Sequence, residues 1–206
     1  MSIIKIDGLY WPKSDKHCRP AVVKELFKIG LLDKYLTEKS VAVQAGGNIG
    51  LFPRELAKDF GVVYTFEPHP ENFNCLALNC PESNIIKFQA GLGNSHEQIE
   101  VGPSRPDLKN NCGAYQVTGV GITPTLMIDD LELPNCDLIY LDIEGYELFA
   151  LQGGYETIKK FHPVIVIENK ELPLMYDVDP DEVIEYLVCE FHYKVAERVQ
   201  RDVILV

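Results

Sequence analysis

The stretch Val41-Ala42-Val43-Gln44-Ala45-Gly46-Gly47-Asn48-Ile49-Gly50 decides the fold. Its apolar, β-branched first half stops at a glycine cluster, and a helical pattern of apolar residues follows directly. This order predicts a strand over residues 41–45, a tight turn, and a helix over residues 49–59. Glycines allow a sharp turn and let a ligand approach the backbone, while the helix start presents unpaired N–H groups. The stretch therefore predicts a nucleotide-shaped binding site.

The spacing of the glycines limits which ligand this turn can hold. A dinucleotide site has G-x-G-x-x-G here, with the pyrophosphate at the helix start, and Gly46-Gly47-Asn48-Ile49-Gly50 does not fit that spacing. About 20 residues further on, Glu67 ends a second predicted strand over residues 62–66, where a carboxylate can accept two ribose hydroxyls. The pattern favours a nucleoside without a pyrophosphate, and S-adenosylmethionine is such a ligand.

Strands and helices alternate after this unit. A helix over residues 70–79 and a strand over residues 85–89 complete a βαβαβ pattern, which is typical of a parallel sheet covered by helices on both faces. In such a sheet the ligand lies outside the carboxyl ends of the strands, where the strand order reverses. The pattern then predicts a strand at 138–142, a helix at 146–160 broken by two glycines, a strand at 164–167, a helix at 181–190, and closing strands at 193–196 and 203–206. The last two strands are expected to form an antiparallel hairpin at the sheet edge.

The remaining segments fit this scheme less well. With 206 residues and 46% hydrophobic content, the chain is expected to form one compact domain. Residues 1–40 are interpreted as an N-terminal helical lead-in to a domain over residues 41–206. Residues 102–123 are rich in glycine, proline and asparagine without a period, so we expect an irregular loop on the substrate side, with disorder as the alternative.

Composition narrows the classes of partner. The 19 basic and 31 acidic residues give a net charge of −12, which disfavours a nucleic-acid substrate and suits small molecules or glycans. The six cysteines form no C-x-x-C pair or zinc-like spacing, as expected for reduced thiols in the cytoplasm. No apolar run approaches membrane-spanning length, so a soluble cytoplasmic protein without a membrane partner is expected. The oligomeric state is not fixed, and a homo-oligomer remains open.

A second informative stretch runs from Asp137 to Glu147, with the sequence DLIYLDIEGYE. It places Asp142 at the carboxyl end of a buried strand and Glu144 just beyond it, beside the predicted ligand crevice. The alternative is that one of these two acids caps the next helix. For Glu147 we keep the simpler interpretation that it complements the helix dipole.

These motifs together resemble the FkbM-type S-adenosylmethionine-dependent methyltransferase family. That family joins a V-D-x-G-A-N-x-G turn, an F-E-P strand end, an L-D-D-L motif, a D-L-I-K-I-D-x-E-G-x-E block and a P-x-x-x-x-E strand. The corresponding residues here are 43–50, 66–68, 128–131, 137–147 and 163–168, in the same order. The acidic block together with F-E-P is far more specific than a lone glycine turn.

The resemblance implies a class I methyltransferase fold, which is Rossmann-like and α/β, with a seven-stranded, mostly parallel sheet. It also implies O-methylation of a hydroxyl on a sugar or another small molecule, with S-adenosylmethionine as cofactor. The residues that it assigns to cofactor binding are Gln44, Gly46, Gly47, Asn48, Gly50, Glu67, Pro68, Gln89, Ala90 and Asp142. Asp142 and Glu144 would lie beside the transferred methyl group.

Two positions depart from the family pattern. Gln44 replaces the acid of the first strand, so it can hydrogen-bond the cofactor but cannot pair as an ion with its ammonium group. Tyr140 replaces the lysine of the I-K-I-D strand. Both departures keep open an alternative from another class, a cofactor-binding module with weak or absent catalysis. A nicotinamide-dependent oxidoreductase is a third interpretation, against which the glycine spacing counts.

The expected chemistry needs one base. Transfer from a sulfonium to an alcohol is an in-line displacement in which positioning dominates, and a neutral hydroxyl needs help to lose its proton. Asp142 is the first candidate for this base and Glu144 the second. Asp142, Glu144 and Glu168 could also converge on a divalent metal, but carboxylates at strand ends more often bind hydroxyls or cap helices, so we predict no metal.

Overall fold

The computed structural model describes residues 3–169 and 175–206. Its main sheet has seven strands in the order β12-β13-β11-β10-β3-β4-β5. Their bounds are β3 Val41–Ala45, β4 Val62–Phe66, β5 Ile85–Phe88, β10 Leu138–Leu141, β11 Val164–Glu168, β12 Val195–Val199 and β13 Asp202–Leu205. Only β13 opposes its neighbours, since it pairs antiparallel with β11 and β12. The predicted mostly parallel sheet and its C-terminal antiparallel hairpin are confirmed.

The strand order places the ligand edge between β3 and β10. From β3 the chain moves outward through β4 to β5, and it then returns to β10 on the other side of β3. The order therefore reverses between β3 and β10, and their carboxyl ends leave a crevice in which α/β proteins bind ligands. Gly46 follows β3 at this edge and Asp142 follows β10.

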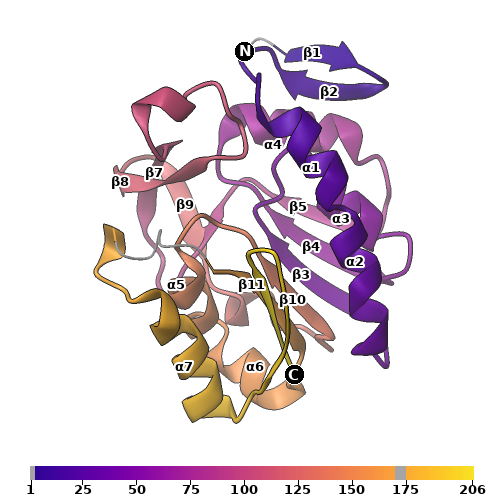
Figure 1. Cartoon of the computed structure of the whole chain (residues 1–206), viewed down its shortest axis with the longest axis vertical. Coiled ribbons are helices and arrows are strands. Elements are labelled where there is room, and N and C mark those ends of the chain that lie inside the picture. Colours follow the sequence, from indigo (N-terminus) through magenta and orange to yellow (C-terminus); the bar gives the residue numbers. More distant parts are fainter. Residues whose placement is uncertain (1–2, 170–174) are drawn as a thin grey trace.

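Helices cover both faces of the sheet (Figure 1). One apolar cluster joins the sheet to α2 (Phe27–Gly30) and α3 (Leu51–Leu56). The other joins it to α5 (Glu147–Gln152), α6 (Tyr155–Phe161) and α7 (Pro180–Phe191). The β-branched strands are buried on both sides, as parallel strands between two helical layers require. None of the helices in residues 3–169 and 175–206 is long and apolar enough to cross a membrane.

The lead-in is not purely helical. It begins with an antiparallel hairpin of β1 (Ile3–Ile6) and β2 (Leu9–Pro12), and α1 (Cys18–Glu25), α2 and a 3-10 turn, η1 (Leu31–Lys34), follow. The hairpin packs on α4 (Pro70–Asn79) at the top of Figure 1. The Asn79 side chain accepts from the Tyr10 N–H at 2.7 Å and donates to the carbonyls of Tyr10 and Ile49. The lead-in is thereby tied to the glycine turn.

The segment that we expected to be an irregular loop, residues 102–123, contributes strand residues to a second sheet. This sheet has the order β6-β9-β7-β8, with β6 Gly91–Leu92, β7 Gln98–Pro103, β8 Tyr115–Val120 and β9 Thr123–Leu126. The prediction of an irregular loop over 102–123 was therefore wrong for the residues in β7, β8 and β9, and it holds for residues 104–114 between β7 and β8. The segment's alternation is weak because glycine and proline occupy strand positions and because Val120 and Ile122 are about nine-tenths exposed. Residues 104–114, including a 3-10 turn (η2, Pro106–Leu108), connect β7 and β8.

Candidate functional site

The glycine turn is shaped by close packing. Gly46 has φ +83°, and a Cβ there would lie 1.9 Å from the carbonyl oxygen of Asp142. Cβ atoms at Gly47 and Gly50 would instead collide with side chains of α4 and of the residue after it, at 2.5 Å from Leu76 and 2.4 Å from Cys80. Gly46 therefore lets the ends of β3 and β10 meet, while the other two glycines let α4 approach the turn.

An inner cavity opens at this crevice. It encloses about 680 Å³, part of it open to solvent, between the ends of β3, β4 and β10 and a roof made by the second sheet. The predicted site residues that line it are Gly46, Asn48, Glu67, Pro68, Ala90, Asp142 and Glu144. Ile99 and Val101 of β7 and Tyr115 to Val117 of β8 form the roof. The second sheet thus covers the region in which the cofactor was expected.

Glu67 is a buried acid of this cavity. Its Oε2 accepts the N–H of Asn48 at 2.7 Å, and its Oε1 accepts the N–H of His69 at 2.8 Å. Burial raises the pKa of Glu67 to about 7, although these bonds and one to the Asn72 side chain oppose the rise. Each carboxylate oxygen has a further lone pair, so the group can also accept from a ligand hydroxyl.

Two amide side chains of the inner cavity were missed at the sequence level. Asn72 on α4 is 1% exposed and Gln116 on β8 is 5% exposed, and both line the cavity. Neither Asn72 Oδ1 nor Gln116 Oε1 has a hydrogen-bond partner among the described residues. Buried acceptors without partners are costly, so a ligand that brings N–H or O–H donors would satisfy them. Asn72 could have been found from its place one turn into the helix after Glu67.

The roof is fastened to the lead-in around Asn48. Asp15 Oδ1 accepts the N–H of Cys18 at 3.1 Å and that of Cys112 at 3.2 Å. Asn48 Nδ2 donates to Cys18 Sγ at 3.4 Å, and Cys112 Sγ donates to Asn48 Oδ1 at 3.5 Å. The Asn72 side chain holds the roof from the other side by donating to the Cys112 carbonyl at 2.8 Å. These contacts join parts of the chain that are far apart in sequence over one cavity.

An outer cavity adjoins the inner one. It is wide and open, about 2000 Å³ including solvent space, and lies between α1, the connection 104–114 and the ends of β10 and β11. Gln44, Gly47, Tyr140 and Glu168 line it, as do Arg105 and Arg201. Five residues line both cavities, namely Gly46, Asn48, Gly113, Asp142 and Glu144. This shared wall is the one place where groups bound in the two cavities would meet.

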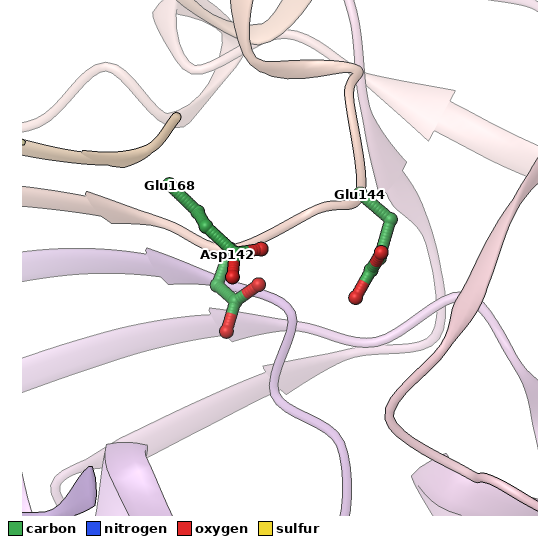
Figure 2. Close-up of side chains that lie close together, drawn as sticks. All are labelled: Asp142, Glu144 and Glu168. Atoms are coloured by element: carbon green, nitrogen blue, oxygen red, sulfur yellow. The ribbon is translucent and has the colours of Figure 1, made fainter. Parts of the chain in front are cut away.

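Three carboxylates gather at this wall. Asp142, Glu144 and Glu168 each bring an oxygen within 4.8 Å of the others, and Figure 2 shows their side chains around one space. Asp142 follows β10 and Glu168 is the last residue of the neighbouring β11, whereas Glu144 reaches the space from the turn beyond β10. The separations and ligand type would suit a divalent cation, and they equally suit the hydroxyls of an acceptor.

Some residues that were predicted to bind the cofactor do not line the inner cavity. Gln44 is 1% exposed, donates to the Ala45 carbonyl at 3.0 Å and accepts the Thr65 hydroxyl at 2.6 Å, so its amide is used within the sheet. Gly47 lies on the outer cavity only. Gly50 and Gln89 are outside the residues that line either cavity.

Tyr140 has a buried charge partner. Its hydroxyl donates to Asp202 Oδ2 at 2.8 Å, and Asp202 Oδ1 accepts from Lys28 Nζ at 3.0 Å. Burial lowers the pKa of Lys28, but the charge and hydrogen bond of Asp202, together with the charges of Glu25 and Asp142, outweigh burial and leave this pKa raised. The ammonium group of Lys28, a residue of the lead-in, thus lies close to the strand that carries Asp142.

Comparison with solved structures supports the fold. The chain superposes on the methyltransferase FkbM of Methylobacillus flagellatus KT with a TM-score of 0.57 and 21% identity, over 81% of this chain and 43% of that one. It superposes on precorrin-6y C5,15-methyltransferase of Geobacter metallireducens GS-15 with a TM-score of 0.55 and 15% identity, over 98% and 94%. The fold is that of a class I, Rossmann-like methyltransferase.

Sequence comparison identifies the family. A curated relative, the hexuronic acid methyltransferase AglP of Haloferax volcanii, is 28% identical over 165 residues, which are 77% of this chain and 66% of that protein. The chain therefore spans just under two thirds of that relative, and less than half of the solved FkbM protein. The family model of the methyltransferase FkbM domain matches residues 44–195, from the end of β3 to the start of β12. The chain belongs to the FkbM methyltransferase family.

Proposed function

We propose that this protein is an S-adenosylmethionine-dependent O-methyltransferase whose acceptor is a hydroxyl of a sugar, with a hexuronic acid as the favoured class. The observation that carries the proposal is that Asp142 and Glu144 line both cavities. A group-transfer enzyme needs donor and acceptor to meet beside the residues that activate them. The shared wall meets that requirement.

The inner cavity suits the cofactor by its polar groups. Asn72 Oδ1 and Gln116 Oε1 are buried acceptors without partners among the described residues, and S-adenosylmethionine brings an adenine amine and two ribose hydroxyls as donors. Glu67 stands at the end of β4, where the ribose was expected. The cofactor is also cationic at its sulfonium and ammonium groups, and Asp142 and Glu144 supply negative charge at the shared wall. These two acids can replace the charge that Gln44 lacks.

The protein's own part in the reaction is positioning and proton removal. When bound, the cofactor supplies an activated methyl group. An acceptor hydroxyl at the shared wall would take that methyl group in exchange for its proton, and a carboxylate of the chain would accept the proton. Asp142 is the proposed proton acceptor, because it follows β10 directly and faces both cavities.

The outer cavity is the proposed acceptor site. Asp142, Glu144 and Glu168 would repel a carboxylate and accept hydrogen bonds from hydroxyls, so a hydroxyl is the favoured methyl acceptor. Arg105 and Arg201 line the same cavity and offer cationic partners for the acid group of a uronic sugar. The relative named as a hexuronic acid methyltransferase agrees with this acceptor class.

The proposal needs no metal. The three carboxylates already have roles, in removing a proton and in binding acceptor hydroxyls, and hydroxyl methylation by a base is complete without a cation. Turnover is therefore expected to persist in a chelating buffer. Loss of turnover in the chelator, restored by added Mg²⁺ or Mn²⁺, would assign the cluster to a metal instead.

Calorimetry and methyl transfer test the proposal in two steps. Titration with S-adenosylmethionine and S-adenosylhomocysteine is expected to give saturable binding, whereas NAD is expected to give none. Radiolabelled cofactor is then supplied with glucuronic acid glycosides and with the matching neutral glucosides as controls. Label is expected on the uronic sugar, at a hydroxyl. Binding without transfer to any acceptor would favour the non-catalytic module, and binding of NAD in place of the two nucleosides would refute the proposal.

A further inference from the structure

A buried carboxylate lies behind the shared wall. Glu147 is the first residue of α5 and is 1% exposed. Its Oε1 accepts the N–H of Ile143 at 3.1 Å and the N–H of Gly145 at 3.3 Å. These two amides flank Glu144, so one oxygen holds both sides of the residue that reaches into the shared wall. Complementing a helix dipole does not require this arrangement.

The turn that Glu147 holds has an unfavourable backbone. Glu144 has φ +54° and Gly145 has φ +100°, so two successive residues are left-handed. A residue with a Cβ adopts this region only when its surroundings enforce it. In this conformation the Glu144 side chain lies with Asp142 and Glu168 around one space (Figure 2). If the turn relaxed to the right-handed region, Glu144 would leave that space.

The fold alone gives little reason for a carboxylate at position 147. Glu147 Oε2 is buried and has no hydrogen-bond partner among the described residues, and burial raises the pKa of this group to about 7. Leaving such a group buried opposes folding. Its measurable benefit is the pair of hydrogen bonds to the 143–145 turn.

We infer that Glu147 is a positioning residue for methyl transfer, which acts by holding the 143–145 turn so that Glu144 stays at the wall between the two cavities. The inference rests on the proposed function, since it concerns turnover at that wall. Glu147 itself is outside the residues that line either cavity, so its effect passes through Glu144.

A double-mutant cycle separates positioning from general stability. Glu147→Leu removes the acceptor and is expected to lower kcat on the order of 10²-fold, because small displacements of a reacting group have effects of this size. Cofactor affinity is expected to fall much less. Glu147→Gln keeps a carbonyl acceptor and is expected to restore most of the turnover. In a Glu144→Ala background, Glu147→Leu is expected to cause no further loss, because the group that it positions is already gone.

Controls make each outcome informative. Glu156→Leu changes an exposed glutamate in the first turn of α6 and is expected to leave turnover unchanged. If Glu147→Leu does not fold, Glu147→Asp keeps the charge but shortens the reach, and it enters the same cycle. The inference would be overturned if Glu147→Leu lowered turnover equally with and without Glu144, or if folded Glu147→Leu kept full turnover. Either outcome would leave the proposed function intact. A wild-type protein that methylates no acceptor would overturn both.

Discussion

The Tyr140 hydroxyl donates a 2.8 Å hydrogen bond to Asp202, and the same carboxylate accepts from Lys28 at 3.0 Å. The three residues come from β10, β13 and α2, so this buried group ties the lead-in to the strand that carries Asp142. Tyr140, which departs from the family pattern, is therefore part of a buried polar group, because Asp202 and Lys28 are buried with it.

Removing Lys28 should cost more stability than removing the Tyr140 hydroxyl. Lys28→Met leaves the buried Asp202 charge without its cation and is expected to lower the free energy of unfolding by about 3–5 kcal/mol. Tyr140→Phe removes one hydrogen bond to a charged group and is expected to lower it by about 1.5–3 kcal/mol. Urea unfolding of both variants provides the comparison. A reversed ranking would show that the charge of Asp202 is screened by solvent.

Gly46→Ala should be more damaging than Gly8→Ala. The two glycines have φ +83° and +84°, but a Cβ at Gly46 would meet the Asp142 carbonyl at 1.9 Å, while at Gly8 nothing lies within 4 Å. Gly8→Ala is therefore expected to cost the backbone conformation alone, about 1–2 kcal/mol. Gly46→Ala is expected to cost a further ~1–3 kcal/mol through the clash. Equal losses in thermal or urea unfolding would mean that β3 and β10 separate freely.

Cofactor affinity should rise with pH through Glu67. Burial raises its pKa to about 7, and the ionised form accepts ribose hydroxyls better than the protonated form. Affinity for S-adenosylhomocysteine is therefore expected to increase from about pH 6 to pH 7 and to level off above it, with proton release on binding below pH 7. Calorimetry in two buffers of different ionisation enthalpy measures that proton. Glu67→Gln is the matched control and should show no such release, and a wild-type affinity independent of pH would contradict the assignment.

The raised pKa of Glu67 also determines whether the free energy of unfolding rises or falls with pH. Glu67 and Glu147 both have a pKa raised by burial to about 7, so the folded protein binds more protons than the unfolded chain between about pH 4.5 and 7. Their contribution is fully present at low pH and is lost as pH rises through 7. Without cofactor, the free energy of unfolding is expected to fall on the order of 4 kcal/mol between about pH 5.5 and 8, about 2 kcal/mol for each of the two groups. Urea unfolding of the double variant Glu67→Gln, Glu147→Gln should show a free energy of unfolding that depends less on pH. An unchanged dependence on pH would contradict the assignment of this effect to the two groups.

Gln116→Leu should affect binding and stability in opposite directions. Gln116 Oε1 is buried without a partner among the described residues, so replacing it relieves a polar group in the free protein. The cofactor-free protein is expected to keep or slightly gain thermal stability. Affinity for S-adenosylhomocysteine is expected to fall by about 2- to 10-fold, the value of one hydrogen bond. Loss of stability with unchanged affinity would remove Gln116 from the cofactor site.

Strand ends were predictable because parallel strands share one carboxyl edge. β3, β4 and α4 match their predicted bounds, since β-branched runs between glycines and prolines leave little choice. That geometry also brings Glu67 and Asp142 to one crevice. Gln116 could not be predicted, because it belongs to a strand whose pattern is interrupted by Gly119 and exposed at Val120. The use of Gln44 within the sheet depends on Thr65 of the neighbouring strand, and only the register shows that pairing.

The connection between β7 and β8 indicates which residues could be exchanged while the inner cavity is kept. Pro103 pairs with Tyr115, and the Ser104 N–H donates to the Ala114 carbonyl at 2.9 Å, so the base of residues 104–114 is closed. Strands β7 and β8 cover the inner cavity, and Ser104, Arg105, Leu108 and Asn111 of the connection line the outer cavity alone. Insertions or exchanges within 104–111 would therefore alter the choice of acceptor, whereas Cys112 and Gly113 would have to stay because they line the inner cavity.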